Sequence, residues 1–574
     1  MRDESGESGL APHFTGYPDT GAWLTNLTDR QRSTMDTPIL LTDEQMQEFL
    51  VTGYLVFYPD VPDGIHDTIY HRLNEIIDEE PNPGNNILPR VPEMRHILNS
   101  PEVRGALISV LGEDYLEHPH RFCHPVWPVK KPLSPKATEE KLSKNSHQDG
   151  YTPLGHPKQH YLRYARIMYY PQDSPVEVGP THVIPGTQFN KGLTDEDRDR
   201  LIPVTGKAGT VSLTHFDVGH AAGVNQMPKF RHMIKFLYLR GEQPRQPSWD
   251  SQSTEWKRPV QVTVPYDLEI VWAHGWDWVC GKADRYASWK QVHADAMADA
   301  ATLIDRAGSN HEVADRIAAI QAIASLAEAG ASAVPTLVSF LDTDHQAVRT
   351  ASIYALGAVG EAAVEPLIDH LRADGQREDG KDLPKGWSEG AISMEDAANA
   401  LGAIGAPAVD ALRALLLESD GWAGINAAFA LGEMDEVASP AVPDLVKCLT
   451  ETRSHRKIRT VLDTLGNIRK DVPVKAISAL FFEDRPEWDE DIHRWWTPTD
   501  GVRTHAAMNL ARLGTDAADA EDDLLKALDD PCGHAGSFAM NALQRIGSPS
   551  ALAATMDYLM SQRWDASVDG VRQF

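Results

Sequence analysis

A short pattern recurs from residue 310 to the C-terminus, and it restricts this region to one kind of fold. Two of its copies are Ala355-Leu-Gly-Ala-Val-Gly360 and Ala400-Leu-Gly-Ala-Ile-Gly405. Each copy is typical of a helix that ends near glycine, followed by a turn and a second apolar helix such as residues 363–371. One helix pair cannot bury its apolar face alone, so the copies must stack into an all-α solenoid. Seven leucines align at spacings of 30, 45, 30, 34, 45 and 33 residues: Leu326, Leu356, Leu401, Leu431, Leu465, Leu510 and Leu543.

The repeats resemble short HEAT repeats of the kind found in phycobilisome-lyase-like proteins, which implies a HEAT-like helical domain over residues 310–574. The two 45-residue spacings predict insertions near residues 375–390 and 483–500. Because solenoids present extended surfaces, a protein partner is one prediction for this region. Self-association, or stabilisation of the rest of the chain, is the preferred one.

The first half of the chain shows a different pattern, that of short strands between turns. Residues 1–36 are polar and predict a flexible arm. Strands expected at 54–57, 161–170 and 233–239 favour a barrel or a two-sheet jelly roll with flanking helices over residues 37–245. Thr42 and Gln45 predict a capping box for the first helix, and Gly53 predicts its end. Six tryptophans between residues 246 and 309 predict a linking segment packed against a neighbour.

Two histidines and an aspartate in this half have the residue types and spacing of an iron site. His147 and Asp149 lie two residues apart, so alternation along a strand places both on one face. His220 follows 71 residues later, and Arg231 another 11. Two histidines and one carboxylate with open coordination positions form the facial triad of non-haem Fe(II) oxygenases. His215 is the alternative third ligand.

The segments around these residues resemble the phytanoyl-CoA dioxygenase family of Fe(II)/2-oxoglutarate oxygenases, from about residue 40 to residue 240. In order they are residues 177–187 (EVGPTHVIPGT), 208–215 (AGTVSLTH) and 220–225 (HAAGVN), followed by Arg231. The resemblance implies a double-stranded β-helix core with His147, Asp149 and His220 as the catalytic iron ligands. It also implies that Arg231 pairs with the distal carboxylate of 2-oxoglutarate, a task that suits a permanently charged, two-donor guanidinium.

Two positions bear on the expected chemistry. Many relatives carry a small hydroxyl residue where this chain has Ala222. Two outcomes are open: the cosubstrate loses that hydrogen bond, or takes it from elsewhere, for example from Asn225 or Lys144. Asn225 is equally expected to be a turn residue. Related halogenases replace the aspartate with a small residue, so Asp149 implies oxygenation. With O2 and 2-oxoglutarate, a substrate C–H bond would be hydroxylated and succinate and CO2 released.

Three functions remain open at this stage. The leading prediction is a dioxygenase that hydroxylates a small-molecule metabolite. The alternatives are a protein or peptide hydroxylase whose substrate is held by the solenoid, and a non-catalytic scaffold. The ordered triad and Arg231 argue against a scaffold, which has no need of them.

Composition narrows the partners and the compartment. The formal net charge of −29 disfavours nucleic acid as a partner. A membrane is also not expected, because no apolar run reaches the ~20 residues that span a bilayer. The N-terminus lacks the pattern of a secretory signal, so a cytoplasmic location is predicted. Four widely separated cysteines predict free thiols.

Overall fold

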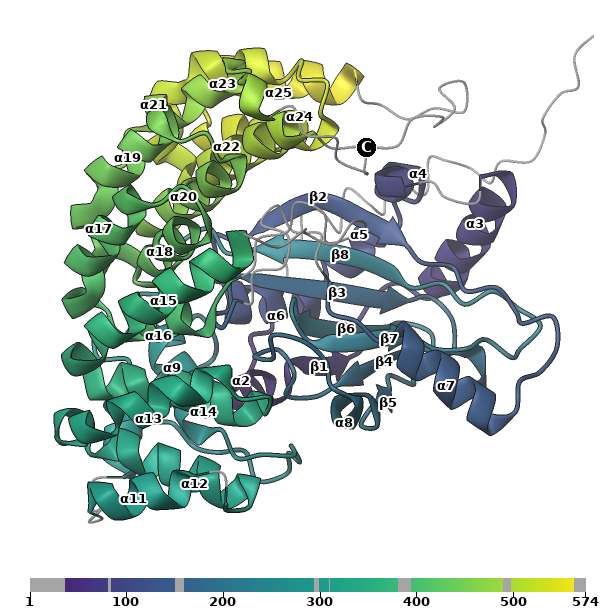
Figure 1. The fold of residues 1–574 in the computed structure, drawn as a ribbon. Coiled ribbons are helices and arrows are strands. Elements are labelled where there is room, and N and C mark those ends of the chain that lie inside the picture. The colour runs from purple at the N-terminus through teal and green to yellow at the C-terminus, as the bar shows by residue number, and fades with distance from the viewer. Residues whose placement is uncertain are drawn as a thin grey trace, which may run out of the picture.

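The computed structural model describes residues 37–80, 84–149, 159–293, 299–308, 310–379, 394–488 and 497–561. The predicted arm and parts of both predicted insertions lie outside these ranges. Two antiparallel sheets with flanking helices come first, and a long arc of paired helices follows (Figure 1). The arc curves around the sheets.

Eight strands form the two sheets. The larger sheet has the order β1 (Tyr54–Phe57), β6 (Thr210–His215), β3 (Tyr164–Tyr170), β8 (Ile234–Leu239) and β2 (Leu116–Cys123). The smaller has the order β5 (Ile202–Pro203), β4 (Thr181–Ile184) and β7 (Gly219–Ala222). All neighbouring strands are antiparallel. The strands predicted at 54–57, 161–170 and 233–239 are β1, β3 and β8.

The first helix, α2 (Asp43–Thr52), confirms its predicted signals. The side chain of Thr42 accepts from the main-chain N–H of Gln45, and that of Gln45 accepts from the N–H of Thr42. Gly53 ends the helix at φ 78°, a left-handed conformation that costs glycine little. The chain then enters β1 directly.

Alternation along β3 divides the larger sheet into two faces. Ile167 and Tyr169 point into the main core, where the Tyr169 hydroxyl contacts His66 Nδ1 at 2.7 Å. Met168 and Tyr170 belong instead to a second apolar cluster with residues of both sheets and their connections. The two sheets therefore face each other across this cluster. The helices around them are α3 (Ile65–Glu79), α4 (Ile87–Arg90), α5 (Met94–Leu98), α6 (Pro101–Leu111), α7 (Pro135–Asn145) and α8 (Asp195–Arg198).

The tryptophan-rich segment joins the two parts of the molecule. It contains α9 (Glu269–Val279), which contacts α2 on one side and the repeat helix α14 on the other, and α10 (Ala287–Val292). Its tryptophans are at most 5% exposed, which confirms that the segment is packed against its neighbours: Trp249, Trp256, Trp272, Trp276, Trp278 and Trp289.

The helical region repeats as the leucine spacing predicts. Six of the seven aligned leucines are fully buried in successive inner helices, and Leu326 directly follows α12. The inner helices are α12 (Val313–Ser325), α14 (Gln346–Val359), α16 (Asp396–Ile404), α18 (Trp422–Glu433), α20 (His455–Ile468), α22 (Pro498–Leu513) and α24 (Gly533–Ile546), each packed on the next. The other helices are α11 (Ala300–Ala307), α13 (Val334–Ser339), α15 (Val364–Asp379), α17 (Val409–Glu418), α19 (Val442–Glu451), α21 (Val474–Ser478), α23 (Glu521–Ala527) and α25 (Pro549–Ser561). Because α11 packs on α12, the helical stack begins at residue 300 rather than 310.

The concave side of the arc packs against the β-rich domain through buried contacts. Arg163, just before β3, pairs with Glu433 at 3.2 Å and with Asp435 at 3.1 Å, and all three side chains are 4% exposed. Near the other end of the arc, the rings of His118 and Phe538 lie 5.0 Å apart. The inner surface of the solenoid is thus occupied by the chain itself along much of its length.

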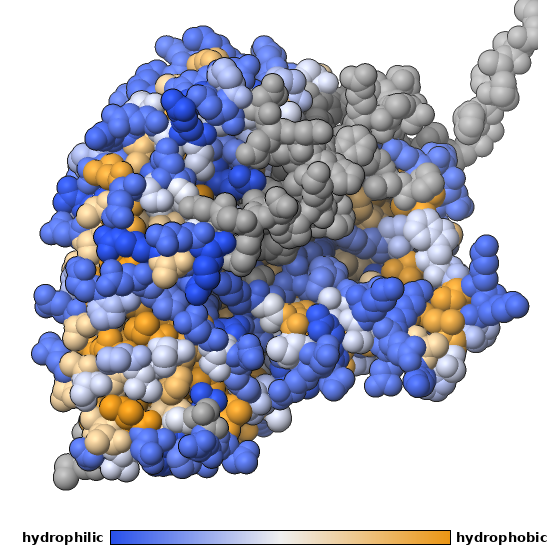
Figure 2. All heavy atoms as spheres, viewed as in Figure 1, coloured by the Kyte–Doolittle hydropathy of each residue, from blue (hydrophilic) through white to orange (hydrophobic). Residues whose placement is uncertain are grey.

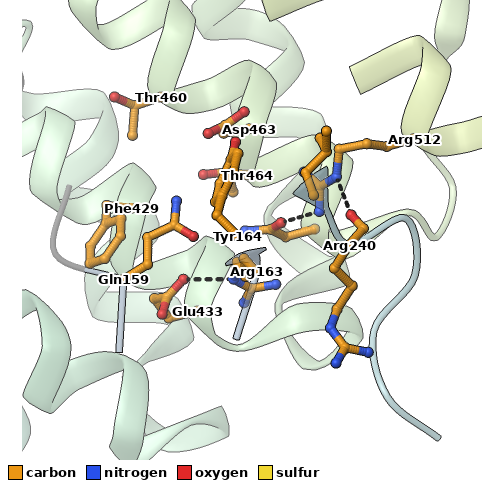
Figure 3. A pocket seen from close by; sticks show the side chains of 12 residues that line it. Gln159, Arg163, Tyr164, Arg240, Phe429, Glu433, Thr460, Asp463, Thr464 and Arg512 are labelled. Carbon is orange, nitrogen blue, oxygen red and sulfur yellow. Dashed lines mark hydrogen bonds and ion pairs between the residues drawn. The ribbon is translucent and has the colours of Figure 1, made fainter. Parts of the chain in front are cut away.

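The interface is closely packed around Arg163, Tyr164 and Arg512 (Figure 3). Arg512 Nε donates to the carbonyl of Arg240 at 3.1 Å, and the hydroxyl of Tyr164 lies 3.8 Å from Met508 Sδ. The cavity here measures about 10 Å³ and holds one water molecule at most. A larger cavity of about 120 Å³ lies between residues 186–200 and residues 344–347, so the fit is not equally close everywhere.

The surface agrees with the composition. Hydrophilic side chains cover most of the face in Figure 2, and apolar ones are visible mainly over the lower part of the arc. One stretch, Gln346–Arg377, is long and apolar enough to cross a membrane by composition, but 67% of its apolar window is buried inside the fold. All four cysteines are buried free thiols, as predicted.

Candidate metal and cosubstrate site

His147, Asp149 and His220 lie together, as the spacing predicts. His147 forms a single antiparallel bridge with His220 of β7, so it lies in an extended segment rather than in a regular strand. The Nε2 atoms of His147 and His220 are 3.5 Å and 3.6 Å from the Asp149 carboxylate oxygens Oδ1 and Oδ2, respectively. One donor atom from each residue lies within 4.8 Å of the others. This arrangement fits one transition-metal ion.

Main-chain carbonyls orient both imidazole rings. His147 Nδ1 is 2.8 Å from the carbonyl of Asn145, and His220 Nδ1 is 3.1 Å from that of Val218. A carbonyl can only accept, so each Nδ1 carries the proton and each Nε2 keeps its lone pair. Metal-binding histidines are held in this way by the partner of their other nitrogen.

Two buried cations contact the Asp149 carboxylate. Lys235 Nζ of β8 lies 2.9 Å from Oδ2, and Arg166 Nη1 of β3 pairs with the same oxygen. The side chains of Arg166 and Lys235 are 0% and 4% exposed. Asp149 therefore links the segment beside β7 to the inner face of the larger sheet.

These contacts set the charge of the site. Burial acts to raise the pKa of Asp149, but Lys235, His220 and Arg166 outweigh it and hold this pKa well below the usual range. Burial lowers the pKa of His220 well below its usual value, against the opposing effect of Asp149. An ionised carboxylate and a neutral imidazole are the forms that bind metal ions.

Arg231 is buried with part of its guanidinium unused. Its Nε donates to the carbonyl of Gly179 at 2.9 Å, and its Nη1 lies 3.5 Å from the carbonyl of His124. Its Nη2 is buried and makes no hydrogen bond to any described residue. No carboxylate of the described part of the chain pairs with it either, and burial lowers its pKa. A buried guanidinium in this state calls for an anionic ligand.

Three hydroxyls lie near this guanidinium. Tyr170 is close enough to interact electrostatically with Arg231, and Thr181 and Ser212 adjoin the Tyr170 hydroxyl. All three hydroxyl oxygens are buried and lack a well-formed hydrogen bond among the described residues. Together with Arg231 they offer buried hydrogen-bond donors for an anionic ligand.

The remaining predicted residues lie elsewhere or are already engaged. The Asn225 amide donates to the carbonyls of Val126 and Lys229, and its oxygen accepts from the Met227 N–H. Of the two roles expected for Asn225, these bonds favour the turn residue, because its amide already contacts the main chain. Lys144 is exposed on the last turn of α7. His215 is not in the donor group, which identifies His220 as the third member.

Sequence reasoning missed Arg166 and Lys235. Their positions in the sequence could have indicated a role. Arg166 is a charged residue within the otherwise uncharged β3, and Lys235 is a charged residue within the apolar β8. Charged residues in the middle of fully buried strands rarely lack a buried partner.

A second group of metal-type donors occurs in the repeat domain. It contains Asp342, His370 and Asp374. His370 already contacts Asp342 at 3.3 Å and Asp374 at 2.9 Å, and Arg377 pairs with both carboxylates. Ion pairs therefore already link the members of this group.

Comparisons with known proteins agree with the geometry. A family model described as Phytanoyl-CoA dioxygenase (PhyH) matches residues 77–233, and one described as HEAT repeats matches residues 300–379. No curated protein matches the sequence.

Solved structures with some likeness include three 2-oxoglutarate-linked enzymes. The carbocyclase SnoK from nogalamycin biosynthesis is 15% identical, with 36% of this chain and 87% of that one covered and a TM-score of 0.28. HygX from Streptomyces hygroscopicus, with nickel and 2-oxoglutarate bound, is 15% identical, with 35% of this chain and 88% of that one covered and a TM-score of 0.28. EctD from S. alaskensis, with 2-oxoglutarate and 5-hydroxyectoine, is 14% identical, with 37% of this chain and 81% of that one covered and a TM-score of 0.26. These scores are too low to carry a conclusion about this chain.

The family match spans the triad and Arg231. It implies the cofactors Fe(II), 2-oxoglutarate and O2, and the donor types of the triad suit Fe(II). The chain therefore joins an oxygenase domain of the phytanoyl-CoA dioxygenase family to a helical domain that contains HEAT repeats.

Proposed function

We propose that this oxygenase hydroxylates a C–H bond of a small-molecule metabolite, with release of succinate and CO2. The observation that supports it best is the pairing of a preformed triad with a buried guanidinium that lacks an anion. Asp149 favours hydroxylation over halogenation, because the carboxylate occupies the place that a halide would need.

The residues divide the task between them. Fe(II) with 2-oxoglutarate and O2 supplies the oxidising chemistry when bound. His147, Asp149 and His220 hold the metal from one side, and Arg231 with the Tyr170 hydroxyl holds the distal carboxylate of the cosubstrate. In this proposal the two sheets are the walls of a double-stranded β-helix, and their buried inner faces keep bulk water away from the reacting groups.

A small substrate is favoured over a protein held by the solenoid. The inner side of the arc, where a peptide would be expected to bind, is covered by contacts such as Arg163–Glu433 and His118–Phe538. A protein substrate is the second candidate, and it would have to dock elsewhere.

Two measurements test the proposed function. Anaerobic addition of Fe(II) and 2-oxoglutarate to the intact protein should produce a visible charge-transfer band, and O2 should then yield succinate. His220→Ala should lose both signals, whereas His71→Ala, which alters a histidine with a 65% exposed side chain, should keep them. A wild-type protein with neither band nor succinate would refute the proposed chemistry.

A further inference from the structure

We propose that Arg166 and Lys235 are positioning residues that hold Asp149 as a single-oxygen ligand of iron, an inference that rests on the proposed function. Both cations contact the same carboxylate oxygen, Oδ2. The other oxygen, Oδ1, lies 3.5 Å from His147 Nε2, whereas His220 Nε2 lies 3.6 Å from Oδ2. The two oxygens of one carboxylate thus have different surroundings.

The main chain alone does not fix this carboxylate. The bridge between His147 and His220 lies two residues before Asp149, which is itself in no helix or strand. The position of the Asp149 side chain therefore depends on what it touches. Both cations come from neighbouring strands of the larger sheet, β3 and β8, which are hydrogen-bonded to each other.

Arg166 is itself held firmly. Its Nε donates to Thr214 Oγ1 at 3.3 Å, and its Nη2 donates to the carbonyl of His215 at 3.2 Å. Its guanidinium carbon lies 5.4 Å from the centre of the Phe216 ring. A planar guanidinium fixed by these three contacts can hold the Asp149 carboxylate in a defined position relative to the sheet.

Single-oxygen binding matters for the reaction. A facial triad works because it leaves the opposite side of the ion open for the cosubstrate and O2. A carboxylate that bound through both oxygens would occupy part of that open side. Contacts that engage Oδ2 prevent this and leave Oδ1 for the metal.

This role predicts different effects on the affinity for the metal ion and on the affinity for 2-oxoglutarate. When Lys235 is replaced, Oδ2 becomes freer to bind the metal, so the affinity for a divalent ion should stay the same or rise. The affinity for 2-oxoglutarate should fall by about tenfold or more, because the cosubstrate then competes with Oδ2. A residue that only stabilised the fold would weaken both affinities together.

The experiment compares Lys235→Met with Lys235→Arg, which keeps the charge, and with Lys207→Met as a control. Lys207 is 83% exposed and pairs with Asp173 on the surface. Mn(II) affinity is measured by electron paramagnetic resonance without cosubstrate. The affinity for 2-oxoglutarate is measured anaerobically from the charge-transfer band with Fe(II). Lys235→Met should bind Mn(II) normally and 2-oxoglutarate weakly, with a shifted band, and Lys235→Arg should restore both.

Parallel losses of both affinities in Lys235→Met, or no change in either, would overturn the positioning role. If Lys235→Met does not fold, Lys235→Gln, which keeps a hydrogen-bond donor without the charge, undergoes the same pair of titrations with the same criteria. A failure of the proposed function is recognised separately, because the wild-type protein would then show no band.

Discussion

Arg231 gives the sharpest test of the cosubstrate site. The change is Arg231→Leu, which removes the charge and keeps an apolar side chain. In the structure the guanidinium is fully buried, Nε and Nη1 contact only main-chain carbonyls, and Nη2 is unused by the described residues. The ligand carboxylate is therefore expected to supply the missing partner.

The magnitude follows from the number of donors. Two hydrogen bonds between a guanidinium and a carboxylate contribute about 1.5–3 kcal/mol each. Their loss should cost at least about 3 kcal/mol, which is more than 100-fold in the Kd of 2-oxoglutarate. The loss of donors to Gly179 and His124 should lower the stability by only about 1–3 kcal/mol.

The assay is an anaerobic titration of the Fe(II) protein with 2-oxoglutarate, followed by the charge-transfer band. Arg372→Leu is the matched control, because Arg372 is 40% exposed on the repeat domain and pairs with Glu418. It should leave the Kd unchanged. A Kd within about threefold of wild type in a folded Arg231→Leu protein would refute the assignment, since that corresponds to less than about 1 kcal/mol.

Four further outcomes are expected. Tyr170→Phe should weaken 2-oxoglutarate binding by about tenfold and leave the urea unfolding midpoint of the ligand-free protein unchanged, because the hydroxyl has no well-formed partner there; a clear loss of stability would contradict this. Arg163→Met should lower the unfolding free energy by about 3–5 kcal/mol, because it leaves buried Glu433 without its ion pair; a loss under about 1 kcal/mol would contradict it. Burial lowers the pKa of His534 to about 4, so protonation of this histidine opposes folding. The free energy of unfolding should be unaffected above pH 6.5 and should fall by roughly 3 kcal/mol as the pH falls toward 4. Unfolding curves at each pH should show this fall, and the fall should be smaller in His534→Gln. Deletion of residues 300–574 should give insoluble protein; a soluble, active fragment would show that the helical domain is not required for the fold.

Local sequence patterns predicted the helix cap, several strands and the helical repeats. The capping box at Thr42, the strands β1, β3 and β8, and the leucines of the solenoid each depend on neighbours within a few residues. The triad was also predictable, because its chemistry restricts the residue types and the family resemblance supplies their order. These signals need no knowledge of the tertiary fold.

The surroundings of Asp149 depend on strand register and were not predictable. Lys235 stands opposite Met168 on β3, and Arg166 stands opposite Thr214 on β6. Only this register brings both cations to one carboxylate. For Asn225 the sequence left two roles open, and its three main-chain hydrogen bonds favour the turn.

The occupied inner face of the solenoid also limits how a substrate reaches the site. The side chain of His147 is 52% exposed, whereas those of Asp149 and His220 are 7% and 4% exposed, so the triad opens toward solvent at His147. His147 directly follows α7, which lies across the sheets from the helical arc in Figure 1. A substrate that approaches on this side need not touch the repeats. We therefore expect the helical domain to contribute to catalysis indirectly: through pairs such as Arg163–Glu433 it holds β3, the strand that carries Arg166 and Tyr170.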